Sequence, residues 1–283
     1  MISIPFSISL SFFLSAIFAA IVSKMGYRIV LLDKTNERSS HSQPTPRGGG
    51  VGIWIALMLI GFFGVEDIFF TLIGGSVGLL GLFEDRFTLS SKSRLIIQLG
   101  LSASVVYLFS GTPASVVAIA FFLFWVLFIA GTANFYNFMD GINGIAGLTG
   151  VVGFGLMAFF SFFIANKPDI VLFSIVLAVA CLGFLPFNFP KARVFMGDEN
   201  LMQAHRSHLY QYMSNELGYP HWKVSLLYAM TQLIVGALAI WAYQRNIVLQ
   251  IVLVAGYGTL FLFSYKLIKA IKPKQVKQQV VRI

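Results

Sequence analysis

Charged residues are scarce in this 283-residue chain. Asp, Glu, Lys and Arg together make up only 11% of it, whereas a typical soluble domain carries about 25%. Cysteine is scarcer still: the single Cys181 lies in an apolar run, which excludes a disulfide framework and a cysteine metal site. Hydrophobic residues, by contrast, make up 57% of the chain, and its mean hydropathy is +0.81. This balance excludes an ordinary soluble fold and indicates an integral membrane protein.

The apolar residues are grouped in long runs. A helix that crosses a membrane needs about 20 mostly apolar residues. Nine segments approach that length: 4–23, 48–65, 67–83, 95–111, 115–133, 144–165, 169–186, 224–243 and 247–265. The first lacks a basic leader and an evident cleavage site, so we interpret it as a retained anchor. We therefore predict an all-α fold, a polytopic bundle of about nine spans in which residues 1–283 form one integral membrane domain. Glu66 and Asp67 should form a tight hairpin between the second and third spans.

The basic residues gather on one side of the predicted bundle. Segments 24–47, 84–94, 187–223 and 266–283 hold 18 of the 20 Lys and Arg residues, and only Lys167 and Arg245 fall on the other side. Because cytoplasmic loops are enriched in Lys and Arg, this bias predicts an outside N-terminus and a cytoplasmic C-terminus. The charges follow a membrane face without a nucleic-acid motif, so the net charge of +9 does not indicate nucleic acid. The basic tail 266–283 is most simply a topology anchor on anionic lipid.

The polar clusters also fall on that predicted cytoplasmic side, in loops 24–50, 84–94, 134–143 and 187–223. A channel or transporter would be expected to place polar residues near the middle of the membrane, in broken helices. Here they stand at the ends of spans. The arrangement favours an active site at the membrane surface, with one water-soluble and one lipid substrate.

The residue types in these loops point to phosphate chemistry. Carboxylates at Glu84, Asp85, Asp140 and Asp198, with nearby amides, are ligands that a hard cation such as Mg²⁺ takes together with substrate phosphates. Cationic and donor side chains suited to phosphate oxygens stand in the same loops: Arg47, Lys92, Arg94, His205, Arg206 and His208. Together they indicate a metal-assisted phosphoryl-transfer site.

Each of these features also has a simpler interpretation. Glu84 could be only a helix cap, and the HRSH stretch could be an ordinary surface cluster. The three glycines after Pro46 could form a hinge between a loop and a helix. Small residues in NFYNFMDGINGIAG (134–147) could serve helix packing, although three Asn and one Asp within ten residues make that interpretation weak.

Five motifs, in this order, resemble one family over nearly the whole chain: DKTNERSSHSQPTPRGGG, GLFEDRF with Lys92, NFYNFMDGINGIAG, ARVFMGD and QAHRSHLYQ. The chain resembles the polyprenyl-phosphate N-acetylhexosamine-1-phosphate transferases, the group that includes phospho-MurNAc-pentapeptide translocase. Within it, the chain is most similar to the glycosyltransferase family 4 branch that starts O-antigen, lipopolysaccharide and related cell-wall polysaccharides. The resemblance implies a bacterial inner-membrane enzyme that transfers a sugar-1-phosphate from a UDP-N-acetylhexosamine to undecaprenyl phosphate and releases UMP.

The resemblance also implies roles for single residues. Glu84, Asp85 and Asp198 match catalytic positions, and Asn137 and Asp198 match positions that hold Mg²⁺, with Mn²⁺ as the alternative ion. Asp140, Gly141 and Asn143 fall where the uridine pocket is built. The remaining positions implied to bind substrate are Arg47, Lys92, Asn134, His205, Arg206 and His208. Neither the sugar, the pathway nor a homodimer is fixed by these motifs.

Three positions depart from the family pattern. Glu84 stands where the acidic pair usually begins with Asp, and Asn143 replaces the second Asp of DGIDG. The third departure is larger, because the family normally carries two further spans between the MGD and histidine motifs. Here Asp198 and His205 are seven residues apart. The loss of two spans keeps both motifs cytoplasmic, so a shortened enzyme and a degenerate, non-catalytic member with a lipid-binding or assembly role remain alternatives.

Overall fold

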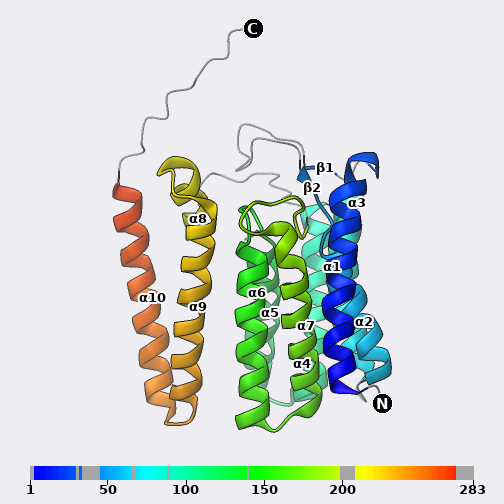
Figure 1. Cartoon of the computed structure of the whole chain (residues 1–283). Helices are drawn as coiled ribbons and strands as arrows, with labels where there is room; N and C mark the ends of the chain where they lie inside the picture. The colour runs from blue at the N-terminus through cyan, green and yellow to red at the C-terminus, as the bar shows by residue number, and fades with distance from the viewer. Residues whose placement is uncertain are drawn as a thin grey trace.

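The computed structural model describes residues 3–29, 32–33, 45–64, 68–87, 90–138, 140–197 and 208–271, without the side chains of 26–29, 32–33, 70, 84–87, 91 and 138. The described chain is mainly helical (Figure 1). Its long helices are α1 (Ile4–Ile29), α2 (Val51–Gly64), α3 (Ile68–Phe87), α4 (Ser91–Ser110), α5 (Val116–Phe138), α6 (Ile145–Phe160), α7 (Pro168–Asn188), α9 (His221–Tyr243) and α10 (Ile247–Ala270). The short elements are β1 (Leu32–Asp33), β2 (Thr45–Pro46), α8 (Leu209–Gln211) and the π-helical turns η1 (Ser161–Ala165) and η2 (Tyr212–Glu216).

Each of the nine predicted spans corresponds to one long helix. Seven of the described helices are long and apolar enough to cross a membrane, which supports a multi-pass membrane protein. The other two are not among the seven. The 14 residues of α2 extend about 21 Å, less than the hydrocarbon core of about 30 Å. Helix α3 has 20 residues, of which Thr71–Phe83 is the apolar stretch between residues 70 and 84–87, whose side chains are not described. The hairpin predicted at Glu66 and Asp67 lies outside the described residues.

Helix α7 occupies the centre of the bundle and α10 its edge. Helix α7 packs against α1, α2 and α6, and 44% of its apolar stretch is buried. Helix α9 packs against α6, and α10 lies mainly on α9, so that these two helices stand at one side of the molecule (Figure 1). No residue of α10 is buried.

Local sequence fixes several helix ends. The Asn246 side chain accepts a hydrogen bond from the Leu249 backbone N–H at 2.8 Å and caps α10. Ser90 caps α4 in the same way through Ser93. Gly144, immediately before α6, has a φ of +85°, a left-handed conformation that favours glycine.

The polar loops gather at one end of the bundle, where α1, α7 and α10 end (Figure 1). We call this end the motif face; it comprises residues 45–50, 140–144, 189–197 and 208–220. The sequence predicted 187–223 as one loop, and this is corrected by the structure: α7 continues to Asn188, α8 and η2 form within the segment, and α9 begins at His221.

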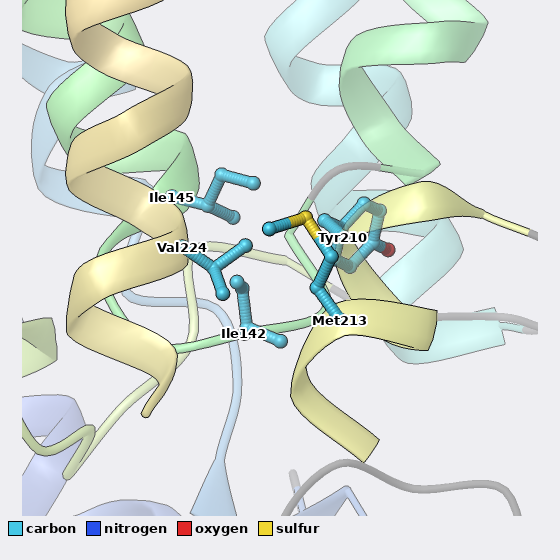
Figure 2. Packing of buried hydrophobic residues seen from close by; sticks show 5 residues of the cluster. All are labelled: Ile142, Ile145, Tyr210, Met213 and Val224. Carbon is cyan, nitrogen blue, oxygen red and sulfur yellow. The ribbon is translucent and has the colours of Figure 1, made fainter. Parts of the chain in front are cut away.

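Helix α8 and η2 form because their apolar side chains have a partner elsewhere in the chain. Tyr210 and Met213 are buried in one cluster with Ile142, Ile145 and Val224. Figure 2 shows these five side chains, from the loop before α6, from the start of α6, from α8 and η2, and from α9, pointing toward one another. The cluster holds the segment that follows the histidine motif against the loop that follows α5.

Candidate functional site on the motif face

The Asp140 carboxylate joins two of the predicted motifs. It is 6% exposed, and its Oδ2 accepts hydrogen bonds from the backbone N–H groups of Met196 at 2.8 Å and Gly197 at 3.0 Å. Bonds from backbone N–H groups to a carboxylate are among the stronger hydrogen bonds in proteins. The DGING loop and the VFMG segment, 56 residues apart in sequence, are therefore held together at one point.

The glycines of the PRGGG stretch lie against the same VFMG segment. The N–H groups of Gly49 and Gly50 donate to the carbonyl oxygens of Phe195 at 2.9 Å and Met196 at 2.8 Å. A Cβ atom on Gly49 would stand 2.6 Å from the Phe184 ring, and one on Gly50 would stand 2.9 Å from the Met196 oxygen. These glycines thus permit close backbone packing between protein segments, beyond the simple hinge considered from sequence.

Asn188 connects the end of α7 to both the DGING loop and the VFMG segment. Its side chain is fully buried at the end of α7. The Oδ1 atom accepts a hydrogen bond from the Gly144 N–H at 2.7 Å, and the Nδ2 group donates to the Val194 oxygen at 2.8 Å. One amide therefore fixes the start of α6 and the VFMG segment to α7.

Asn143 connects the DGING loop to the segment after α7 and to the first turns of α9. Its Nδ2 group donates to the Pro190 oxygen at 3.3 Å, and its carbonyl oxygen accepts from the Ser225 hydroxyl at 2.8 Å. Asn143, predicted to line the uridine pocket, is thus engaged in placing the loop, and Gly141, two residues earlier, is buried.

His208 is the N-cap residue of α8. Its ring stacks on Tyr210 with centroids 6.0 Å apart. Burial lowers the pKa of His208 from its usual value of 6.5, and the nearby Lys269 ammonium lowers the pKa further. At neutral pH the imidazole is therefore neutral. It can donate or accept a hydrogen bond but does not supply a permanent positive charge.

Three other predicted substrate-binding residues differ in their surroundings. The Asn134 amide donates to Gln98 Oε1 of α4 and to the Ala130 oxygen at 3.1 Å, so it faces the packing between α4 and α5. Lys92 is exposed in the first turn of α4. Arg47 is half-buried directly before Gly48, next to the segments that Asp140 joins.

Several predicted residues lie outside the described part of the structure. The side chains of Glu84 and Asp85, in the last turn of α3, are not described, nor are Asp198, His205 and Arg206. Asn137 is half-buried near the end of α5, and its amide oxygen is a ligand type that Mg²⁺ takes. Among the described residues, no three His, Cys, Asp or Glu side chains form a metal-ligand group. The acidic partner predicted for Asn137, Asp198, is not among those residues.

Sequence reasoning missed Asn188 and Ser225. The only sequence signal for Asn188 is a polar residue inside the apolar stretch FLPFNFP. The sequence also gives no direct sign of the link between η2 and the end of α10, where the Tyr212 hydroxyl donates to the Ile271 oxygen at 2.8 Å. These contacts join residues that are far apart in sequence, so no local pattern reveals them.

The fold and the motif face define a helical membrane protein whose polar motifs, as far as they are described, lie at one end of the bundle. The model of glycosyl transferase family 4 matches residues 68–201. The chain is 30% identical over 196 residues to the undecaprenyl-phosphate alpha-N-acetylglucosaminyl 1-phosphate transferase of Thermotoga maritima. This alignment covers 67% of the chain and 57% of the relative. The chain is 31% identical over 199 residues to the decaprenyl-phosphate N-acetylglucosaminephosphotransferase of Mycolicibacterium smegmatis. This second alignment covers 59% of the chain and 48% of the relative.

The chain thus spans about half the length of these curated relatives. The matches confirm the placement predicted from the motifs: the chain belongs to the superfamily of polyprenyl-phosphate N-acetylhexosamine-1-phosphate transferases.

Proposed function

We propose that this protein transfers N-acetylhexosamine-1-phosphate from a UDP-sugar to undecaprenyl phosphate. An oxygen of the lipid phosphate attacks the β-phosphorus of the UDP-sugar. The bond between that phosphorus and the bridging oxygen breaks, UMP leaves, and a lipid-linked diphosphate sugar forms. The proposal rests on the family and on the names of the relatives, which act on undecaprenyl or decaprenyl phosphate.

The observation that carries the proposal is the pair of hydrogen bonds from Met196 and Gly197 to the Asp140 carboxylate. These bonds hold the motif proposed for the nucleotide next to the start of the MGD motif. The sugar nucleotide's uridine and diphosphate need sites that are close together, and the two motifs supply them from one place. Catalysis of phosphoryl transfer depends largely on such positioning and on charge stabilisation.

Within this proposal the acidic residues divide the work. Glu84 and Asp85 accept the lipid phosphate's proton or would contact the metal. The Asp198 carboxylate and the Asn137 amide oxygen would hold Mg²⁺ or Mn²⁺. The ion, when bound, would neutralise charge on the diphosphate oxygens. The chain's own donors, Arg47, Lys92, Arg206 and the two histidines His205 and His208, orient the phosphates and the sugar.

We place the motif face at the cytoplasmic surface of the bacterial inner membrane. The basic residues cluster in the loops on this side, as cytoplasmic loops do. A UDP-sugar is water-soluble and reaches the site from the cytoplasm, whereas undecaprenyl phosphate reaches it through the membrane. Initiation of O-antigen or a related cell-envelope polysaccharide is the pathway that this reaction would serve.

The direct test is UMP release by the purified full chain from UDP-N-acetylglucosamine or UDP-N-acetylgalactosamine. Release should require both undecaprenyl phosphate and Mg²⁺. Asp198→Ala should abolish it, whereas Lys223→Gln, an exposed charge change on the same face, should leave it intact. Normal turnover by the Asp198 variant would remove that residue from the mechanism.

A second measurement separates the two substrates. Lys92 is exposed at the start of α4, next to the end of α3 that carries Glu84 and Asp85. Lys92→Ala should raise the KM for undecaprenyl phosphate more than the KM for the UDP-sugar, because we assign Lys92 to the lipid phosphate. Equal increases for both substrates would contradict the assignment.

The second candidate is a non-catalytic family member with a lipid-binding or assembly role. It is favoured by the spacing of only seven residues between Asp198 and His205. Inserting the two corresponding spans of a relative between Asp198 and Gln203 should raise both UMP release and stability in detergent if the chain is a weakened enzyme. An unmodified chain that turns over as fast as an intact relative would show that the two spans are dispensable.

A further inference from the structure

A large apolar cavity opens among α6, α8, α9 and α10. Its volume is about 1120 Å³. Most of its wall is formed by side chains of three spanning helices, among them Leu156, Met157, Leu227, Val235, Leu260 and Phe261. The cavity is separate from the contacts around Asp140, and none of the roles assigned above uses its apolar part.

The cavity extends over about one leaflet of a membrane. On α9 it runs from Leu227 to Ile240, and on α10 from Tyr257 to Ile268. With a rise of about 1.5 Å per residue, these stretches are roughly 20 Å and roughly 17 Å long. Half of a hydrocarbon core of about 30 Å is close to these lengths, and Ile268 and His208 place one end of the cavity at the motif face.

That end of the cavity carries positive charge and hydroxyl groups. Lys269 lies beside it, with its Nζ atom 4.1 Å from the Tyr212 ring centre and 5.8 Å from the ring centre of the cavity-lining Tyr265. The Tyr212 hydroxyl donates to the Ile271 oxygen, which fixes the end of α10 here. None of the described residues that line the cavity is acidic.

Two of the polar side chains that line the deeper part of the cavity contact protein. The Thr149 hydroxyl donates to the Ile145 oxygen of its own helix at 2.6 Å. The Gln232 amide lies against Gly153, where α9 meets α6. The lining of the cavity is thus mainly apolar, and the described charge lies at the motif-face end.

We propose that this cavity binds an anionic phospholipid of the leaflet at the motif face. Its acyl chains would lie between α6, α9 and α10, and its phosphate would meet Lys269. The apolar length matches one leaflet, and the charge at the mouth has the sign that attracts a lipid phosphate. A polyprenyl chain is far longer than one leaflet. The lipid would also cover α10, which buries none of its residues in the protein.

The test uses the full chain purified in a neutral detergent, with thermal unfolding measured against added lipid. The added lipids are phosphatidylglycerol, phosphatidylcholine and undecaprenyl phosphate. We expect phosphatidylglycerol to raise the Tm in a saturable way, since a ligand that binds only the folded state stabilises it. Phosphatidylcholine should act only at much higher concentration, because its headgroup has no net charge.

Variants locate the effect. Lys269→Gln should raise the half-saturating concentration of phosphatidylglycerol about tenfold, the loss expected for one charge-assisted contact. Lys223→Gln is the matched control, because this exposed lysine stands at the same face on α9 and does not line the cavity. Ser264→Phe narrows the cavity without changing charge and should also weaken the effect. Each shift is referred to the variant's own lipid-free Tm, so a change in basal stability does not obscure it.

Three outcomes would overturn the proposal: equal shifts with phosphatidylcholine and phosphatidylglycerol, an unchanged response in both Lys269→Gln and Ser264→Phe, or a response to undecaprenyl phosphate alone. The last would make the cavity an acceptor site. The test does not depend on turnover, so its result and that of the UMP assay are independent.

Discussion

Around Asp140, the 140–144 loop, the end of α7 at Asn188 and the 194–197 segment are joined by hydrogen bonds between side chains and backbone. Around α10 the opposite holds: the helix buries no residue and is fixed at its end by Tyr212. We call the first region the Asp140 region and the second the α10 edge. The comparison teaches that a few buried polar groups stabilise the motif loops from within the protein. The position of the α10 edge depends instead on the lipid or detergent that surrounds it.

The largest effect should come from Asn188 in the Asp140 region. Asn188→Ala leaves the Gly144 N–H and the Val194 oxygen without their buried partner, at a cost of about 1–3 kcal/mol for each group. We therefore expect a large fall in the midpoint of thermal unfolding in detergent. Asn246→Ala at the α10 edge is the control, and loss of this exposed cap should cost only about 1 kcal/mol. Equal losses would remove the distinction between the two regions.

Replacing one glycine in each region tests how closely the surrounding atoms pack in the Asp140 region and at the α10 edge. At Gly144 the φ is +85° and a Cβ atom would collide with the Phe189 ring, so Gly144→Ala should cost about 1–3 kcal/mol. At Gly258 in α10 no atom lies within 4 Å of the added Cβ. Gly258→Ala should therefore be neutral or stabilise the helix by up to about 1 kcal/mol. The midpoint of thermal unfolding should be measured for both variants. A fall of similar size in both midpoints would contradict our account.

The negative charge of Asp140 should contribute less to the stability of the fold than the oxygen with which this side chain accepts its hydrogen bonds. Asp140→Asn keeps one oxygen that can accept from Met196 and Gly197, and we expect a loss of about 1 kcal/mol. Asp140→Ala removes the acceptor and should cost more. Unfolding midpoints for both variants test this order, and an Asn variant as unstable as the Ala variant would show that the carboxylate charge dominates.

The smallest effect should be the pH dependence due to His208. Its pKa is lowered in the folded chain, so the unfolded chain takes up the proton more readily. The stability contributed by the neutral ring is present above the unfolded pKa of about 6.5 and is lost as the pH falls toward the folded pKa. His208→Asn should therefore reduce the fall in Tm between about pH 8 and about pH 5. An unchanged slope would show that other groups cause the fall.

The comparison also explains which features could be predicted from sequence. Long apolar runs depend on local composition, so each of the nine predicted segments is a helix in the structure. Helices α1 and α10 extend beyond their predicted ends at residues 23 and 265, because Lys24, Lys266 and Lys269 can continue a helix while their charged ends reach polar surroundings. Composition alone did not indicate that.

The missed features all depend on distant partners. Helix α8 and η2 form against Ile142 and Val224, and Asn188 acquires its role only when Gly144 and Val194 are near. The motifs themselves were visible, because phosphate chemistry needs particular residue types. The roles of Glu84, Asp85, Asp198, His205 and Arg206 stay predictions.

The most direct test of the account follows the β-phosphorus of the sugar nucleotide. The purified chain is given a UDP-N-acetylhexosamine labelled at that phosphorus, together with undecaprenyl phosphate and Mg²⁺, and the lipid is extracted. Our account predicts that the label moves into the lipid while unlabelled UMP is released. Label that remains in UDP would indicate transfer of the sugar alone, and label that remains in the UDP-sugar would indicate no transfer; either result would contradict the proposed reaction.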